Sequence, residues 1–182
     1  MNIFEAIKKG DAILRESGIK SYKIDSEILM SRVIKKNRAD IILNSKTELS
    51  QKDYNLYENL IIQRSKQKPI AYLTGKKEFW KYEFIVTKDV LIPRPDTEII
   101  IEQVLKLNKN RFKQRILDIG VGSGCILLSL LKEKKDFSGT GIDKSAKCIS
   151  LSQINAQRLG LTNRVKFFKS DVDNFLNGKY DL

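Results

Sequence analysis

The chain of 182 residues contains no histidine, only two cysteines and a single tryptophan. Without an imidazole, the sequence excludes a histidine general base and a histidine-ligated metal, which removes many hydrolases and zinc enzymes. The two cysteines, Cys125 and Cys148, lack the spacing of a zinc site and are too few for a disulfide framework. We therefore expect no metal site and interpret both cysteines as small buried residues.

Long apolar runs and targeting patterns are also missing. No segment reaches the ~18 consecutive apolar residues of a membrane span. The first residues, MNIFEAIKK, lack the pattern of a signal peptide. With 41% hydrophobic and 31% charged residues, the composition is that of an ordinary globular protein. We expect a cytoplasmic protein with no membrane partner.

Acidic residues are scarce relative to basic ones. The sequence has 34 Lys and Arg against 22 Asp and Glu, which gives a formal net charge of +12. An excess of this size favours an acidic partner such as nucleic acid or the ribosome. The basic residues are spread along the chain, however, and a Lys-rich genomic composition explains the charge equally well. The charge alone locates no binding surface.

Residues 1 to about 68 predict a small helical domain, because apolar residues recur there at helical spacing. One helix is predicted over Asn2–Ser17 and stops at Gly18. A second begins at Asp25, whose carboxylate can cap free N–H groups. A third begins after Ser50 and ends at Pro69.

After Pro69 the helical pattern is broken. Two short strands, Glu78–Trp80 and Glu83–Thr87, predict a β-hairpin that connects two domains. The next segment, LIPRPDTE, places a proline on each side of Arg94, which makes this loop extended and stiff. A stiff loop can present Arg94 to a ligand at low entropic cost, but pairing of this arginine with a nearby carboxylate explains it as well.

A helix predicted over Glu98–Leu107 leads into the segment RILDIGVGSG, residues 115–124, and then into an apolar run. An apolar strand that ends in three glycines spaced two apart and turns helical at once is typical of a nucleotide-binding α/β unit. Glycine lets the loop turn tightly and lets a ligand lie against bare backbone N–H groups. The candidate loop residues are Gly120, Val121, Gly122, Ser123 and Gly124.

Acidic residues follow the next two predicted strands. The strand Ser138–Ile142 ends at Asp143, about 20 residues past the glycine loop, where a carboxylate can accept hydrogen bonds from both ribose hydroxyls of a nucleoside. Asp171 follows the strand Val165–Phe168. Its carboxylate can accept a hydrogen bond from an adenine amino group or, equally well, cap a helix over Val172–Leu176.

The final residues, GKYDL, look like the beginning of a fourth strand. A parallel sheet of three strands with an open edge is incomplete. We therefore expect the sequence to be a truncated piece of a longer protein.

Four motifs, LIPRPDTE, LDIGVGSGCI, GIDKS and SDV, in this order and spacing resemble the HemK-type glutamine methyltransferases that act on peptide chain release factors. The resemblance covers nearly the whole chain, including the hairpin segment GKKEFWKYEF. It implies an α/β fold: a Rossmann-like class I methyltransferase sheet, incomplete at the C-terminus, preceded by a small all-helical domain and a β-hairpin connector. The implied divisions are a substrate-docking domain (1–72), the connector with the start of the Pro-Arg-Pro loop (73–93), and the first part of the cofactor domain (94–182).

The resemblance implies S-adenosylmethionine as the cofactor. Asp118 would orient the amino group of its methionine portion, Asp143 would hold its ribose, and Asp171 would frame its adenine. The implied cofactor-binding residues are Arg94, Pro95, Asp118, Gly120, Val121, Gly122, Ser123, Gly124, Asp143, Asp171 and Val172.

The implied substrate is the glutamine of a Gly-Gly-Gln tripeptide in a class 1 release factor, whose methylation modulates translation termination. A sulfonium methyl group is already electrophilic, so the enzyme supplies alignment and electrostatics rather than a histidine base. In this family an Asn-Pro-Pro-Tyr tetrad past the fourth strand accepts hydrogen bonds from the amide nitrogen. The sequence stops at Leu182, before any such tetrad. We expect no catalytic residue within it and no methyl transfer by this piece alone.

Two other functions compete with this interpretation. A nucleic-acid amino-methyltransferase shares the cofactor fold and is favoured by the charge of +12, whereas the proline-arginine-proline loop argues against it. A non-catalytic module that docks on a translation factor or the ribosome would use the α/β half as a scaffold. The sequence leaves the preferred release factor and the oligomeric state open.

Overall fold

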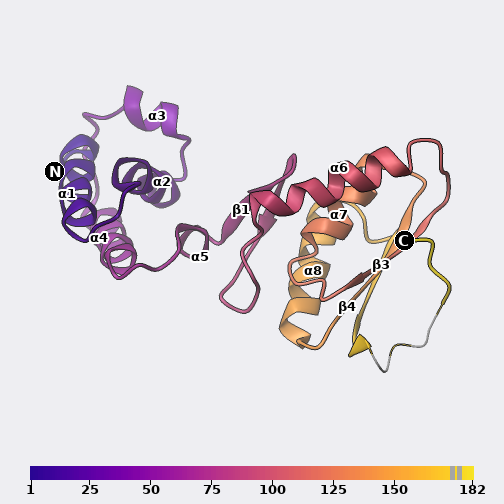
Figure 1. Ribbon diagram of the computed structural model, residues 1–182. Coiled ribbons are helices and arrows are strands. Elements are labelled where there is room, and N and C mark those ends of the chain that lie inside the picture. The colour runs from indigo at the N-terminus through magenta and orange to yellow at the C-terminus, as the bar shows by residue number, and fades with distance from the viewer. Residues whose placement is uncertain (173–174, 176–177) are drawn as a thin grey trace. The chain divides into compact units, whose positions relative to one another are not determined.

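The computed structural model describes residues 1–172, 175 and 178–182. Its contacts divide the chain into two compact units, Met1–Thr74 and Gly75–Leu182. The first unit is helical and the second is α/β with a parallel sheet, which is the fold class that the sequence predicts (Figure 1). In the part of the chain that the structure describes, no helix combines the length and the apolar character that crossing a membrane requires.

Three longer helices of the first unit pack against one another around its core. Asn2 begins the first of them with a capping box, because its side chain accepts a hydrogen bond from Glu5 N at 2.9 Å and Glu5 accepts one from Asn2 N at 3.0 Å. Leu29, Met30 and Ile61 are among the most deeply buried residues of this core. The elements of this unit are α1 (Ile3–Glu16), α2 (Tyr22–Ile34), α3 (Arg38–Leu43), α4 (Gln51–Ser65) and α5 (Ile70–Thr74).

Two details of the first unit differ from the prediction. The helix α2 begins at Tyr22, three residues before Asp25, so Asp25 is not its cap. Instead, its buried carboxylate accepts a hydrogen bond from Arg64 Nε at 2.7 Å, which joins α2 to α4. Pro69 was expected to end helical structure, yet α5 follows it directly. Proline fits the start of a helix because it has no N–H to satisfy there.

The hairpin consists of β1 (Lys76–Phe79) and β2 (Tyr82–Ile85), paired antiparallel. Its turn lies earlier than predicted, because Trp80 has φ of 57° and cannot continue β1. Two glutamates hold Trp80 in this conformation. Its backbone N–H donates to Glu98 Oε1 and its indole Nε1 donates to Glu133 Oε1, both at 2.9 Å.

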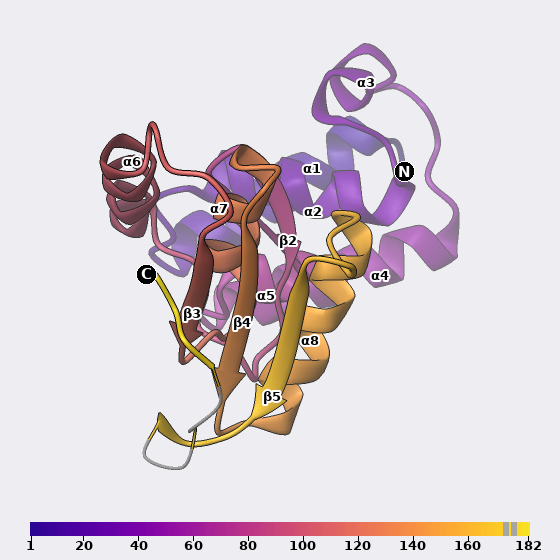
Figure 2. The ribbon, with the colours of Figure 1, turned by 90° about the vertical axis from the view of Figure 1, so that its right-hand side faces the viewer.

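The sheet of the second unit has three parallel strands in the order β3-β4-β5. The helices that connect the strands lie against one of its faces (Figure 2). The predicted helix Glu98–Leu107 and the predicted strands Ser138–Ile142 and Val165–Phe168 agree with the observed elements to within a residue at each end. The elements are α6 (Glu98–Leu107), β3 (Arg115–Ile119), α7 (Cys125–Glu133), β4 (Ser138–Asp143), α8 (Ala146–Arg158) and β5 (Val165–Lys169), with the short 3-10 helix η1 (Pro95–Thr97) before α6.

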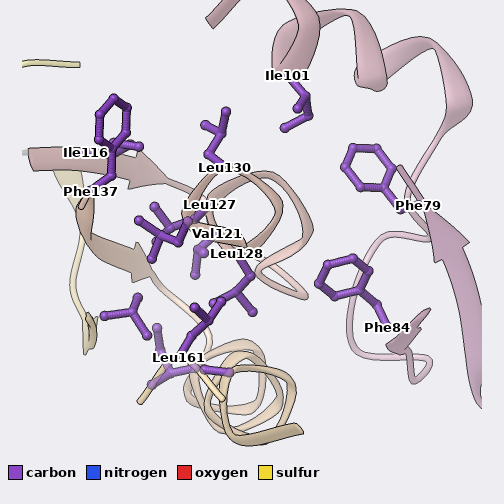
Figure 3. Close-up of a cluster of buried hydrophobic side chains, with 14 residues drawn as sticks. Phe79, Phe84, Ile101, Ile116, Val121, Leu127, Leu128, Leu130, Phe137 and Leu161 are labelled. Atoms are coloured by element: carbon purple, nitrogen blue, oxygen red, sulfur yellow. The ribbon is translucent and has the colours of Figure 1, made fainter. Parts of the chain in front are cut away.

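The core of the second unit gathers around α7 (Figure 3). Phe79 and Phe84 bring the hairpin into this core. Gly139 of β4 allows α7 to lie close to the sheet, because a Cβ at this position would be only 2.5 Å from Leu127 Cδ1. The glycine loop at the start of α7 is therefore supported by a packed core.

The last residues lie beside β3, on the edge that faces away from β4 (Figure 2). Asp181 N donates to Arg115 O at 2.8 Å, and Leu117 N donates to Leu182 O at 2.9 Å. Both hydrogen bonds fit a chain that runs in the same direction as β3, but residues 178–182 form no strand, so the predicted beginning of a fourth strand stays a prediction. The helix predicted over Val172–Leu176 lies partly outside the described residues.

Candidate cofactor site

The glycine loop, residues 120–124, joins β3 to α7 at the carboxyl edge of the sheet. Gly120, Gly122 and Gly124 have φ values of 77°, 54° and 80°, in the left-handed region that side chains with a Cβ disfavour. A Cβ on Gly120 would meet no atom within 4 Å, and one on Gly122 would meet only Gly120 O at 3.9 Å. The loop therefore exposes bare backbone over open space, as a ligand that lies against it requires.

Backbone hydrogen bonds attach the loop to β4. Gly120 N and Val121 N both donate to Ile142 O at 2.9 Å. Gly122 N donates to Asp143 Oδ2 at 3.0 Å, and Ser145 N donates to Asp143 Oδ1 at 2.8 Å. Besides the ribose contact that the sequence predicts, the Asp143 carboxylate thus holds the glycine loop against the start of α8.

Asp118 lies near the end of β3, two residues before the loop, and is half-buried. Its pKa is raised to about 6: burial is the main cause, a hydrogen bond from the backbone of Leu127 opposes the rise, and the charge of Asp143 adds to it. A carboxyl group that ionises reluctantly gains most from a cation placed beside it. This position therefore favours a ligand with an ammonium group.

Asp171 follows β5 at the same edge of the sheet. Ser170 N donates to Asp143 O at 3.0 Å, which brings the end of β5 to the end of β4. The Asp171 carboxylate lies 2.8 Å from Lys144 Nζ and accepts a hydrogen bond from Val172 N at 2.7 Å. Val172 itself is exposed.

The structure thus brings Asp118, the glycine loop, Asp143 and Asp171 to one edge. Arg94 has an extended backbone, as the flanking prolines predict, and its carbonyl accepts a hydrogen bond from Thr97 N at 3.1 Å where η1 begins. Arg94 and Pro95 are exposed, and among the described residues neither forms a hydrogen bond to the glycine loop. That they line the cofactor cleft stays a prediction.

The two cysteines lie close to this edge. Cys148 is buried as predicted, whereas Cys125, the first residue of α7, is only half-buried. Burial raises the pKa of the Cys125 thiol to about 11, so it is uncharged at neutral pH. Within the described ranges, no group of three His, Cys, Asp or Glu side chains is arranged to hold a metal ion.

Two residues of α8 that were not predicted from the sequence bind the glycine loop. Ser152 Oγ donates to Gly122 O at 2.8 Å, and Asn155 Nδ2 donates to Ser123 O at 2.9 Å. Both residues are buried, with exposed fractions of 0% and 1%. The one signal in the sequence is that two polar residues three apart interrupt the apolar side of an amphipathic helix.

Each unit of the chain matches a family model. Residues 5–75 match the family model described as PrmC N-terminal domain, and residues 96–182 match the one described as methyltransferase small domain. The chain is 42% identical over its full length to the release factor glutamine methyltransferase of Buchnera aphidicola subsp. Schizaphis graminum. It is 41% identical over 94% of its length to the protein of that name in Clostridium acetobutylicum.

The chain spans 65% of the length of the Buchnera relative and 60% of the Clostridium relative. A solved structure, the SAM-dependent methyltransferase from Geobacter sulfurreducens in complex with S-adenosyl-L-homocysteine, is 26% identical over 46% of this chain and 32% of that chain. The TM-score of this structure is 0.39.

Proposed function

We propose that this chain, which belongs to the family of release factor glutamine methyltransferases, binds S-adenosylmethionine at the edge described above. We further propose that the whole protein transfers the methyl group to the side-chain amide nitrogen of a release factor glutamine. The observation that carries the cofactor proposal is the open glycine backbone directly beside the half-buried Asp118, whose pKa is raised.

The charges at the loop favour S-adenosylmethionine over a dinucleotide. A pyrophosphate at a helix N-terminus gains from positive charge and loses from negative charge nearby. Here the carboxylate of Asp118 lies two residues before the loop, and one of the loop's N–H groups, that of Gly122, already donates to Asp143. S-adenosylmethionine carries an ammonium and a sulfonium group, which carboxylates stabilise.

Each predicted site residue has a part in this proposal. Asp118 binds the ammonium group, and residues 120–124 lie against the methionine and ribose portions. Asp143 binds the ribose, Asp171 and Val172 frame the adenine, and Arg94 with Pro95 covers the cofactor side of the cleft. The cofactor supplies an electrophilic methyl group, so the chain contributes binding and orientation.

The helical unit is proposed to hold the body of a class 1 release factor, with residues 1–72 as the docking domain. The match of residues 5–75 to the PrmC N-terminal domain supports this assignment. The substrate is a component of translation, so the proposed site of action is the cytoplasm. The glutamine of the Gly-Gly-Gln tripeptide is the proposed acceptor.

A thermal shift measurement tests the cofactor proposal. The melting temperature of the chain is expected to rise with S-adenosylmethionine or S-adenosylhomocysteine, because a ligand at a hundred times its Kd stabilises the folded state by about 2.7 kcal/mol. NAD serves as the control and is expected to cause no rise. A non-catalytic scaffold responds to none of these ligands, and such a result would contradict the proposal.

The net charge of +12 favours a second candidate, a nucleic-acid amino-methyltransferase. Affinity for RNA through many phosphate contacts falls by orders of magnitude between about 50 and about 200 mM salt. We expect binding of a release factor to persist over that range and binding of RNA to be lost. Tight RNA binding at the higher salt concentration, without binding of a release factor, would favour the nucleic-acid substrate.

A further inference from the structure

The glycine loop is open on one side and anchored on the other. Space lies over Gly120 and Gly122, where a ligand would be seated. The carbonyl oxygens of Gly122 and Ser123 instead accept hydrogen bonds from Ser152 and Asn155 of α8. The buried side of the loop is therefore bound by side chains from a distant part of the sequence.

Asn155 also binds the hairpin. Its Nδ2 donates to Ile85 O at 3.0 Å, and its Oδ1 accepts from Ile85 N at 2.8 Å. One buried amide thus satisfies the backbone of Ile85 and the carbonyl of Ser123 together. Serine, alanine or leucine cannot replace it, because this position needs two donors and one acceptor in one plane.

The loop depends on its hydrogen bonds to hold one shape. Three of its five residues are glycines with positive φ, and glycine has more backbone freedom to lose than any other residue. The hydrogen bonds from α8 restrict that freedom. A ligand that binds one loop shape has an apparent affinity proportional to the population of that shape.

We propose that Ser152 and Asn155 are positioning residues, which hold the glycine loop in the conformation that binds the cofactor. Asn155 in addition couples that conformation to the hairpin through Ile85. This inference rests on the proposed S-adenosylmethionine site. Neither residue needs to touch the cofactor, because both act through the carbonyls of the loop.

Ser152→Ala is the test variant, and the chain provides a matched control in Ser129→Ala. Ser129 lies on α7 and is equally buried, but its Oγ has no hydrogen-bond partner among the described residues. With S-adenosylhomocysteine as the probe in calorimetry, Ser152→Ala is expected to weaken binding roughly three- to tenfold, the range of one lost hydrogen bond. Ser129→Ala is expected to leave the Kd unchanged.

A second control separates positioning from general stability. The guanidinium of Arg164 donates to the carbonyls of Leu131, Lys134, Lys135 and Phe137 at the end of α7, away from the loop. Arg164→Lys is therefore expected to lower the melting temperature and to leave the Kd unchanged. If affinity followed melting temperature across the three variants, the inference would be overturned.

Amide hydrogen exchange provides a readout without ligand. The exchange of the Gly122 and Gly124 amides is expected to be faster in Ser152→Ala than in the wild type and unchanged in Ser129→Ala. Unchanged exchange, or wild-type affinity in Ser152→Ala, overturns the inference and leaves the cofactor site standing. A wild-type chain that binds no S-adenosylhomocysteine overturns the proposed cofactor site, and the positioning role with it.

Discussion

Replacement of Asp118 by asparagine is expected to stabilise the ligand-free chain and to weaken its binding of S-adenosylmethionine. Burial raises the pKa of this carboxyl from an ordinary 3.8 to about 6. A shift of one pKa unit between the unfolded and folded states corresponds to about 1.4 kcal/mol. Ionised Asp118 therefore costs the folded state about 3 kcal/mol at neutral pH. Asparagine has nearly the same shape and avoids this cost.

The advantage of asparagine depends on pH. Because the folded-state pKa of Asp118 lies above the unfolded-state value, the folded chain binds the proton more tightly. The contribution of Asp118 to stability is therefore fully present below pH about 4 and is lost as the pH rises to about 6. Asp118→Asn should match the wild type near the lower pH and exceed it by about 3 kcal/mol above the upper one.

Urea denaturation of both proteins at several pH values measures this difference. Glu16→Gln is the matched control, because it removes one negative charge at an exposed position, where we expect little change. Calorimetry should show that Asp118→Asn binds S-adenosylmethionine more weakly than the wild type. The affinity of the wild type should fall below pH about 6, where Asp118 becomes protonated. A variant that is less stable than the wild type at pH about 8, well above that pKa, would refute the role assigned to burial.

Three further results are expected. Asp143→Asn should weaken S-adenosylmethionine binding by ~1–3 kcal/mol in calorimetry, since asparagine offers a single acceptor to Gly122 N and Ser145 N and loses the charge at the ribose. Unchanged affinity would contradict the proposed contact between Asp143 and the ribose. Gly139→Ala should lower the free energy of unfolding by ~1–3 kcal/mol, because the Cβ of the alanine would lie 2.5 Å from Leu127 Cδ1. A variant as stable as the wild type would contradict the close packing of α7 against β4. The 182-residue chain should transfer no labelled methyl group to a release factor, and label in the release factor would disprove this.

The strand, loop and helix around residues 115–133 could be predicted from sequence because their causes are local. The apolar alternation of β3, the three glycines and the apolar run of α7 are all contiguous. The start of α2 and the turn at Trp80 could not be predicted in this way. Asp25 is held by Arg64, and Trp80 by Glu98 and Glu133, so their conformations depend on partners far along the chain.

The same distinction applies to the candidate site. The gathering of Asp118, Asp143 and Asp171 could be predicted, because parallel strands place their carboxyl ends at one edge of a sheet. Ser152 and Asn155 could not, because their partners are backbone carbonyls, which carry no sequence pattern. The proposed cofactor and release factor substrate depend on the resemblance to a family, since the glycine loop alone indicates only a nucleotide-binding α/β unit.

The most direct test of the cofactor site is a titration of the isotope-labelled chain with S-adenosylhomocysteine, followed through the backbone amide signals. The signals of Gly120, Gly122 and Gly124 are expected to shift in a saturable manner, together with those of Asp143 and Val172. Binding that moves other signals and leaves these glycines unchanged would contradict the placement of the cofactor on the glycine loop.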